Sequence, residues 1–238
     1  METFETMLRD YFDASRVPAD LVTRLTRRPR GGSPFDPERT AARFVIEASE
    51  RGVHRIGFAA GRGRTIGDQR QAARARRELA EYLAGTRTFF SLDVDLSGIP
   101  PFQGDVLAAA AGIPYGETTS YAALAEAVGR PRAARAVGNA LGANPLPIVI
   151  PCHRIIRGDG TWGHYAFGPR MKTALLTLER ETPALVGCAT TRIVCRRGCA
   201  HERRIHEDNR IVFASVADAG SVGYRPCRVC RPGRGSVR

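Results

Sequence analysis

Residues 146–154 read Leu-Pro-Ile-Val-Ile-Pro-Cys-His-Arg, and the interpretation of the whole chain depends on this stretch. The apolar run 146–150 predicts a buried strand, which would place Cys152 at the end of a rigid element with little water around it. A thiol in that place is either an inert core residue or a positioned nucleophile, and the adjacent His153 favours the nucleophile. Because neighbours in an extended segment point to opposite faces, we expect the two side chains to communicate through a water molecule or through a local kink of the chain.

Composition and charge limit the class of protein. The 238 residues, 43% of them hydrophobic, are enough for one large or two modest domains with cores of their own. No stretch approaches the ~20 apolar residues of a membrane span and no leader peptide opens the chain, so we expect a cytoplasmic protein without membrane contact. The net charge of +12 indicates a polyanionic partner, foremost nucleic acid. The alternative is a solvated surface that is basic only through a bias towards arginine.

The first hundred residues predict a helical extension followed by a small α+β unit. Apolar residues at helical spacing mark a helix within residues 1–30, and the Gly- and Pro-containing stretch that follows is interpreted as a linker up to residue 37. Two short apolar runs within residues 44–58 predict a hairpin, and residues 69–83 predict a polar, arginine-rich helix. The alternating residues 89–96 predict a further strand.

The next segment is predicted to be helical. Residues 102–111 form one helix, and Thr119 or Ser120 can cap a second helix over residues 121–128. A Gly-containing turn then leads into an alanine-rich helix over residues 132–141. Two short helices around such a turn are typical of a helix-turn-helix, which places its second helix in a DNA groove.

Five motifs in this part of the chain resemble the O6-alkylguanine-DNA alkyltransferases. They stand in the order and spacing of that family, and the likeness runs from about residue 40 to Glu179, with its strongest part over residues 113–156. The motifs are Ile113-Pro114-Tyr115-Gly116-Glu117-Thr118, Ser120-Tyr121, Ala134-Arg135-Ala136-Val137-Gly138, Asn144-Pro145 and Pro151-Cys152-His153-Arg154. Together they are far more specific than the last motif alone.

The resemblance implies direct, irreversible repair of alkylated DNA. A guanine alkylated at O6 is flipped out of the double helix, and its alkyl group passes to Cys152, which is consumed. By the positions that match, His153 is the base that works through a water molecule, and Glu179 orients this histidine. Asn144 would brace the site, and Tyr121 would assist the flipped base.

Two further parts of the site follow from the same resemblance. Arg135 would fill the space that the flipped base leaves in the double helix. Tyr165, Ala166 and Phe167 would line the alkyl pocket, where this chain departs from the small residue-Gly-Gly-Leu sequence that the family usually has after the tyrosine. Because Phe167 can narrow the pocket, we expect transfer of a methyl group rather than of bulky groups.

Five of the six cysteines crowd the C-terminal fifth of the chain, which in a cytosolic protein indicates metal binding more than disulfides. Cys195-x3-Cys199 and Cys227-x2-Cys230 form two close pairs, and four such thiolates suit a tetrahedral zinc ion. A module of fewer than ~60 residues also needs a metal in order to fold. A redox-active cysteine pair is the alternative, and Cys188 fits neither arrangement.

The residues around these cysteines resemble the zinc domain of the Ada family. The matching stretches are Thr190-Thr191-Arg192-Ile193-Val194-Cys195, Val212-Phe213-Ala214-Ser215 and Gly223-Tyr224-Arg225-Pro226-Cys227-Arg228-Val229-Cys230. The resemblance implies that all four cysteines bind zinc and that Cys195 accepts a second methyl group, from a methylphosphotriester. Thr191 is expected to contact DNA, and the charge that faces the phosphates is expected from Arg192, Arg196, Arg197, Arg203 and Arg204. A purely structural zinc ribbon that grips DNA is the alternative.

The predicted fold class is α+β, in four parts. An N-terminal extension over residues 1–37 precedes an RNase H-like subdomain over 38–98, a winged-helix-like, helix-turn-helix alkyltransferase domain over 99–180, and an Ada-type zinc module over 188–233. We expect a monomeric methylated-DNA–protein-cysteine methyltransferase that acts once on double-stranded DNA carrying O6-alkylguanine.

Two rival functions remain at the level of sequence. The first is a methylation-activated sensor or transcriptional regulator. The position of the zinc module after the alkyltransferase domain, rather than before it as in the familiar Ada arrangement, argues against this rival. The second is a non-catalytic binder of alkyl lesions, which would not require a thiol at Cys152.

Overall fold

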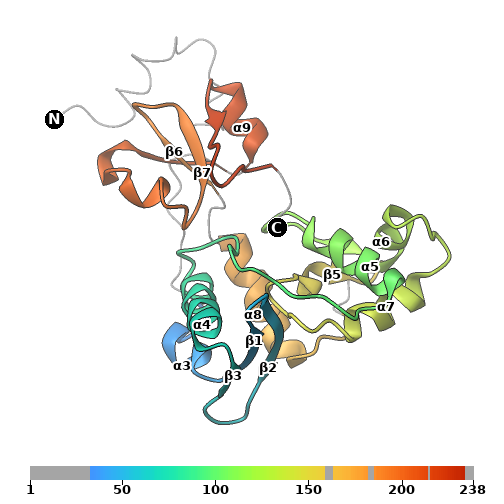
Figure 1. Ribbon diagram of the computed structural model, residues 1–238. Helices are drawn as coiled ribbons and strands as arrows, with labels where there is room; N and C mark the ends of the chain where they lie inside the picture. The colour runs from blue at the N-terminus through green and yellow to red at the C-terminus, as the bar shows by residue number, and fades with distance from the viewer. Residues whose placement is uncertain (1–32, 159–162, 182–184, 214, 234–238) are drawn as a thin grey trace.

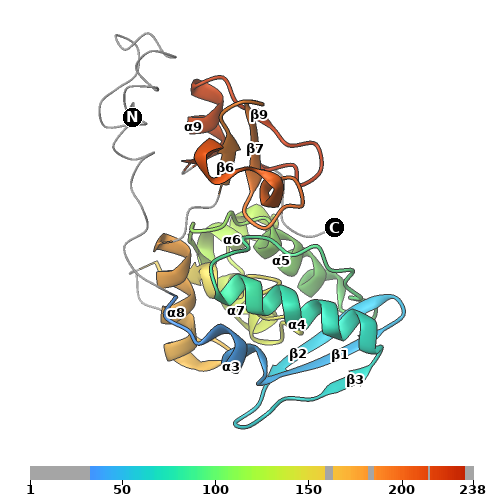
Figure 2. The ribbon, with the colours of Figure 1, turned by 90° about the vertical axis from the view of Figure 1, so that its left-hand side faces the viewer.

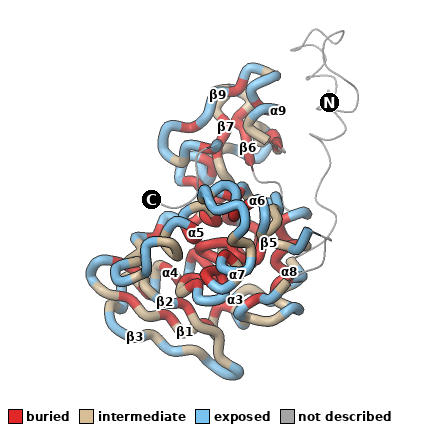
Figure 3. The backbone as a smooth tube through the Cα atoms, turned by 90° about the vertical axis from the view of Figure 1, so that its right-hand side faces the viewer, coloured by how far each residue is buried: buried red, intermediate tan, exposed pale blue. Residues whose placement is uncertain are grey.

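The computed structural model describes residues 33–158, 163–181, 185–213 and 215–233, and the helix predicted within residues 1–30 lies outside them. The described chain forms two bodies, each with buried residues of its own: a main body up to residue 181 and a C-terminal module from Leu185 on (Figures 1 and 3). None of the described helices is long and apolar enough to cross a membrane.

The sheet of the main body starts with the predicted hairpin. β1 (Phe44–Ser49) pairs antiparallel with β2 (Gly52–Phe58), and β3 (Thr65–Gly67) pairs parallel with the other edge of β1. The strand order is therefore β2-β1-β3. Residues of β1 alternate between buried and half-buried, as expected for a strand with one packed face. The long helix α4 (Gln69–Leu83) packs against this sheet, with the short α3 (Pro37–Ala41) beside it (Figure 2).

Helix α4 (Gln69–Leu83) has the bounds that the sequence predicted. Asp68 caps its N-terminus, because its Oδ1 accepts a hydrogen bond from the Gln71 N–H at 2.7 Å. The buried residues of α4 are Ala72, Ala75, Glu78, Leu79, Ala80, Tyr82 and Leu83. Two of these, Glu78 and Tyr82, carry polar groups, and both bind segments that lie beyond the helix.

The strand predicted over residues 89–96 is wrong. Within the described residues, only Val94 of this stretch makes a β-bridge, to Val53 at the edge of the sheet. A side chain of α4 binds the backbone instead, since Glu78 accepts a hydrogen bond from the Ser91 N–H at 2.8 Å. Alternating apolar residues indicate which face of a segment is buried, but they do not show whether a strand or a side chain satisfies its backbone.

The helical domain follows the predicted order. α5 (Pro101–Ala111) leads to α6 (Tyr121–Ala127) and α7 (Ala134–Gly142), and the three helices pack on one another. The last two, joined by a turn at Gly129, form the predicted helix-turn-helix.

Ser120 joins this domain to the segment that carries Cys152. Its Oγ accepts a hydrogen bond from the Ala123 N–H at 3.0 Å and so caps α6. The short strand β4 (Thr119–Ser120), to which Ser120 belongs, pairs parallel with β5 (Ile155–Ile156), just after the cysteine. α8 (Gly168–Glu181) follows and packs against the turn that holds the cysteine.

The buried run 146–150 is not a strand, which corrects the prediction. Ile148 has a φ of 75°, so the chain turns instead of extending. The Asn144 side chain crosses the turn and donates a hydrogen bond to the Ile150 carbonyl at 2.9 Å. Cys152 therefore lies in a short 3-10 turn, η1 (Cys152–Arg154), rather than at a strand end. A short apolar run that is buried all round looks the same in sequence whichever shape it takes.

The C-terminal module is a four-stranded sheet with strand order β8-β6-β7-β9. Its elements are β6 (Leu185–Cys188), β7 (Ile193–Arg196), η2 (Glu202–Arg204), η3 (Glu207–Asn209), β8 (Arg210–Phe213), α9 (Val216–Ser221) and β9 (Arg225–Pro226). Gly187 in β6 is required by packing, since a Cβ there would lie 2.6 Å from the Phe213 ring and 2.7 Å from the Tyr224 ring. This close approach forms the small core of the module.

Candidate functional site

The Cys152 thiol is buried, 6% exposed, in the turn that joins the helical domain to α8. The amide nitrogen of Asn144 donates a hydrogen bond to the Cys152 Sγ at 3.2 Å and another to the Ile150 carbonyl. The amide oxygen of the same side chain accepts a hydrogen bond from the Leu146 N–H at 3.0 Å. One side chain therefore holds both the loop and the sulfur.

The thiol is protonated at neutral pH. Burial raises the pKa of Cys152, and the Asn144 amide and the charge of Lys172 offset only part of that rise. Lys172 is itself buried in α8, where its Nζ donates to the Ile155 carbonyl at 2.6 Å. Burial lowers the pKa of this lysine to about 8. The sulfur needs a base before it can act as a nucleophile.

A buried carboxylate, that of Glu179, gathers groups from three other segments of the chain. Glu179 is 3% exposed. It accepts hydrogen bonds from the His153 Nε2 at 2.6 Å, the Arg154 Nε at 2.8 Å and the Gly116 N–H at 3.0 Å. The hydroxyl of Tyr82 also donates to it. The structure thus brings together Glu179 and His153, which the sequence had linked, and adds three further partners.

The protonation states of this group follow from burial and charge. Burial alone would raise the pKa of Glu179, but the charge of Arg154 and the hydrogen bond from His153 hold it well below its usual range. Burial lowers the pKa of His153 even though Glu179 opposes the change, so the imidazole is neutral. Because a carboxylate only accepts, Nε2 carries the ring proton. The other nitrogen, Nδ1, is buried without a hydrogen-bond partner among the described residues and is the basic site.

Sequence reasoning missed Tyr82 and gave Arg154 no role. Tyr82 is fully buried and stacks on Phe90, with ring centroids 5.1 Å apart. Burial and the nearby charge of Glu179 raise the pKa of Tyr82 well above its usual value, so its hydroxyl keeps the proton that it donates. Arg154 is fixed by a second bond, to the Ile113 carbonyl at 2.7 Å. The available signal was a tyrosine on the buried face of α4, because a buried tyrosine hydroxyl usually has a hydrogen-bond partner.

Tyr121 and Arg135 lie in different surroundings. Tyr121 opens α6 and is half-buried. Burial and the Cys152 thiol raise the pKa of Tyr121, so its hydroxyl keeps its proton at neutral pH. Its ring also contacts α7, because a Cβ at Gly138 would lie 3.7 Å from it. Arg135 is exposed on α7, in the second helix of the helix-turn-helix.

The segment predicted to line the alkyl pocket is anchored by its aromatic side chains. Tyr165 is buried and meets the His153 ring edge-on, with centroids 6.0 Å apart. Phe167 is half-buried and packs on Phe58 of β2, with centroids 5.5 Å apart, at the edge of the core of the main body. Ala166, between the two aromatic residues, is exposed.

The four thiols of the C-terminal module meet at one point, as the spacing predicted. The sulfurs of Cys195, Cys199, Cys227 and Cys230 all lie within 4.8 Å of one another. A tetrahedral zinc ion with Zn–S bonds of about 2.3 Å requires sulfurs about 3.8 Å apart. The donor set and its spacing fit zinc, which these four residues would hold and whose charge would keep them as thiolates.

Three of the four thiols accept hydrogen bonds from N–H groups. The donors are the Arg196 N–H to Cys230 at 3.2 Å and the backbone N–H groups of His201 and Glu202 to Cys199. The His201 Nδ1 lies 3.6 Å from the Cys227 sulfur and is assigned as the donor there, because a zinc-bound thiolate can only accept. Within the part of the chain that the structure describes, no N–H group donates to Cys195. Such bonds stabilise a thiolate and reduce its nucleophilicity.

The turn between β6 and β7 carries the two residues predicted to contact DNA. Thr191 is exposed. Arg192 has a left-handed backbone, with a φ of 53°, and its guanidinium lies 5.5 Å from the centroid of the Tyr224 ring. The same guanidinium donates to the Val222 carbonyl at 3.2 Å. The module itself therefore orients Arg192.

Two family models match the chain. The DNA-binding domain of 6-O-methylguanine DNA methyltransferase matches residues 101–181, and the metal-binding domain of Ada matches residues 180–233. A methylated-DNA–protein-cysteine methyltransferase of Methanosarcina barkeri is 38% identical over 144 residues, which cover 58% of this chain and 90% of the relative.

Other relatives with the same name are more similar over a shorter span. The one from Mycolicibacterium paratuberculosis is 49% identical over 112 residues, 47% of this chain and 67% of the relative. The constitutive one from Bacillus subtilis is 47% identical over 109 residues, 45% of this chain and 66% of the relative. Among solved structures, a Mycobacterium tuberculosis O6-methylguanine methyltransferase matches with a TM-score of 0.50 and 34% identity, covering 58% of this chain and 94% of the other. This likeness confirms the predicted α+β fold class.

The zinc site gives a prediction about folding. Cys227→Ser removes one of four ligands, so we expect zinc content to fall towards zero and the C-terminal module to unfold, because a body this small depends on its metal. Metal analysis and thermal unfolding measure the two effects. Cys188→Ser, which removes a buried thiol of the same module outside the cluster, is the matched control and should retain zinc. Zinc retained in Cys227→Ser would contradict the assignment.

Proposed function

The chain belongs to the methylated-DNA–protein-cysteine methyltransferase family, and from this premise we propose that it repairs O6-methylguanine in double-stranded DNA by transferring the methyl group to Cys152. The observation that carries the proposal is the buried row of Cys152, His153 and Glu179, with a neutral imidazole whose Nδ1 is free to accept a proton. A row of this kind converts a protonated thiol into a nucleophile only when a substrate is bound beside it.

The row of Cys152, His153 and Glu179, which we call the relay, removes the proton from the thiol. Asn144 donates to the sulfur and so stabilises negative charge as it develops there. His153 accepts the thiol proton at Nδ1 through a water molecule, and Glu179 stabilises the imidazolium that results. Tyr82 and Arg154 keep the Glu179 carboxylate charged and fixed in place.

The transfer is a single displacement in which atoms and charge balance. A bond forms between the methyl carbon and the Cys152 sulfur, and the bond between that carbon and O6 breaks. The thiol proton leaves through His153, and the repaired guanine takes up a proton, for which the hydroxyl of Tyr121 is the nearby donor. The thioether product is stable to water, so each chain acts once.

The alkylated guanine must be flipped out of the double helix before it can reach Cys152. Extruding a guanine costs a few kcal/mol, which contacts in the pocket and in the duplex must offset. The exposed Arg135 on α7 is placed to enter the duplex in the position of the extruded base. The net charge of +12 supports binding to the phosphate backbone. All the residues of this row come from one chain, which supports action as a monomer, and a DNA substrate implies action inside the cell.

The alkyl pocket favours methyl groups. Tyr165 lies edge-on against His153, and Phe167 is held by the core of the main body, where it packs on Phe58. Aromatic side chains that are fixed in this way leave little freedom for the segment to move aside. The methyl group is therefore the substrate that we assign, in preference to bulkier groups.

A second transfer takes place in the C-terminal module. We assign Cys195 as the acceptor of a methyl group from a DNA methylphosphotriester, because it is the thiol without an N–H donor in the described structure. Zinc holds the four sulfurs as thiolates when it is bound. Methylation removes one negative charge near the DNA, which favours DNA binding after repair. The same step would serve a sensor, and sequence-specific binding after methylation is the measurement that would favour that rival.

The principal test labels the methyl group. Wild-type protein is incubated with duplex DNA that carries O6-[methyl-labelled]guanine and is then digested. We expect the label on Cys152, at no more than one per chain from this substrate, and none on Cys152→Ala. Cys188→Ser should behave as wild type. Label on another residue, or label that persists in Cys152→Ala, would exclude the proposed acceptor.

Tyr82→Phe tests the positioning of Glu179. Loss of one hydrogen bond to a charged group, about 1.4 kcal/mol, should slow methyl transfer roughly tenfold at pH 7. The pKa of Cys152 is raised, so the thiolate forms without the relay only at alkaline pH, and the deficit should shrink as pH rises towards 9. Tyr224→Phe, the same change in the C-terminal module, should leave the rate unchanged. A deficit of equal size at every pH would indicate a merely structural role.

The second acceptor is tested in Cys152→Ala protein, which removes the first one. Incubation with DNA that carries a labelled methylphosphotriester should place the label on Cys195, as peptide mapping of the four zinc-binding cysteines would reveal. Cys230 is the most exposed of the four, so label on Cys230 would show that exposure and not the pattern of N–H donors decides reactivity. No label on any of them would leave the module as a DNA-binding zinc ribbon.

A further inference from the structure

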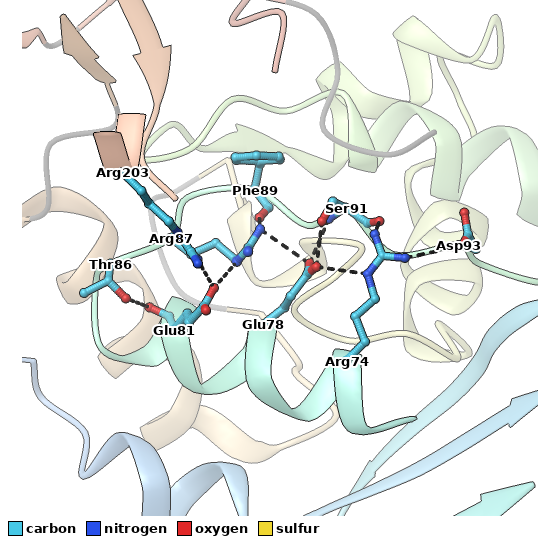
Figure 4. A network of polar contacts seen from close by, with 9 residues as sticks. All are labelled: Arg74, Glu78, Glu81, Thr86, Arg87, Phe89, Ser91, Asp93 and Arg203. Carbon is cyan, nitrogen blue, oxygen red and sulfur yellow. Dashed lines mark hydrogen bonds and ion pairs between the residues drawn. The ribbon is translucent and has the colours of Figure 1, made fainter. Parts of the chain in front are cut away.

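The C-terminal module is docked on the main body through the strap that follows α4, residues Thr86–Phe89 (Figure 4). The Thr88 N–H donates to the Arg197 carbonyl at 3.1 Å, which joins the two backbones. The guanidinium of Arg203, in η2 of the module, contacts the Glu81 carboxylate of α4 at 2.7 Å. Docking therefore uses both a backbone bond and an ion pair.

The aromatic ring of the strap lies between two arginines from the two bodies. The guanidinium of Arg87, in the strap, is 5.4 Å from the centroid of the Phe89 ring, and that of Arg196, in the module, is 5.7 Å from it. The ring also packs against the cluster of zinc-binding cysteines. The bodies approach closely here, since a Cβ at Gly198 would lie 3.1 Å from the Cβ of Arg87.

Residues of the main body hold the Glu81 carboxylate in place and keep it charged for its ion pair with Arg203. Its Oε2 accepts from the Arg87 Nε at 2.7 Å and from the Arg203 Nη2 at 2.7 Å, so one oxygen links the two bodies. Arg87 is in turn held by Glu78, with 3.5 Å between Nη1 and Oε2. Burial by itself raises the pKa of Glu81, but the two arginines hold it below its usual value, so the carboxylate is charged.

The docking of the C-terminal module uses basic residues that we expected, from the sequence, to face DNA phosphates. Of the five arginines expected to face phosphates, Arg196, Arg197 and Arg203 contact the main body through a side chain or the backbone. Carboxylate and phosphate oxygens offer a guanidinium the same kind of charge-assisted hydrogen bond. A fixed carboxylate at Arg203 therefore competes directly with a phosphate for that side chain.

We propose that Glu81 takes the place of a DNA phosphate at Arg203, so that docking of the C-terminal module and DNA binding by this face of the module exclude each other. The docked state also protects the second acceptor, because Cys195 is 1% exposed and Phe89 packs against its cluster. The module then reaches a methylphosphotriester only after it has left the strap. This inference rests on the proposed DNA binding of the module and not on transfer to Cys195.

The test compares Glu81→Gln with Glu50→Gln, a matched loss of one negative charge at an exposed turn of the main body. Both are made with Arg135→Ala to weaken binding by the helix-turn-helix, and the probe is a short unmodified duplex followed by fluorescence anisotropy. Glu81→Gln should bind up to about fivefold more tightly than Glu50→Gln, the value of one partly exposed ion pair. The slope of log affinity against log salt concentration should also be steeper for Glu81→Gln, by about the amount that one additional phosphate contact contributes.

Two further measurements make the proposal falsifiable. Small-angle scattering without DNA should show a larger radius of gyration for Glu81→Gln than for Glu50→Gln, since the module has left the strap. Arg203→Gln should undock in the same way but gain no affinity, because it loses the phosphate contact together with the ion pair. Equal DNA binding by the two glutamate variants, or tighter binding with the module still docked, would overturn the proposal. Because the probe carries no methyl group, an inert Cys195 would not change any of these outcomes.

Discussion

The charge on Glu179 is the constraint on which the main body depends. An ionised carboxylate that is 3% exposed is tolerated only when donors surround it, and breaking such a buried pair costs about 3–5 kcal/mol. The donors come from α4, from the turn at Gly116 and from the turn that contains His153 and Arg154. The α+β part and the helical part of the main body are therefore joined at Glu179, the carboxylate that we propose orients His153. The same hydrogen bonds to Glu179 stabilise the fold and hold His153 in place, so these side chains are fixed before DNA binds.

The cysteine is held by a loop whose shape comes from a side chain. Asn144 binds the Ile150 carbonyl, the Leu146 N–H and the sulfur itself, so one amide decides where the chain turns and what the thiol contacts. A strand would have turned adjacent side chains to opposite faces. The 3-10 turn at Cys152–Arg154 instead allows the histidine and arginine to meet Glu179 while the thiol remains beside Asn144.

How far the sequence could predict this arrangement depends on the range of the interactions. Local signals were sufficient for α4, the hairpin, the cap at Ser120 and the metal ligands, because each is set by neighbours in the chain or by fixed spacing. Residues 89–96 and 146–150 were predicted as strands because periodicity reports burial and not the partner of the backbone. Tyr82 was missed because it binds Glu179 across 97 residues, a pairing that only the packed fold creates. The family resemblance supplied Glu179 but not the groups that hold it.

The excess of arginine has more than one use, and this changes how the charge of +12 should be interpreted. Arg154 is buried and neutralises Glu179, Arg87 links two glutamates of α4, and Arg203 binds Glu81. Arg154 and Arg87 are buried and support the fold, whereas Arg203 is half exposed and is paired with Glu81 in the docked module. Net charge therefore overstates the surface that is free for DNA until the module leaves the strap. The two proposed acceptors therefore differ in what holds them: Asn144 contacts the Cys152 sulfur in the main body, whereas Cys195 is buried in a module that the Glu81–Arg203 ion pair helps to hold on the main body.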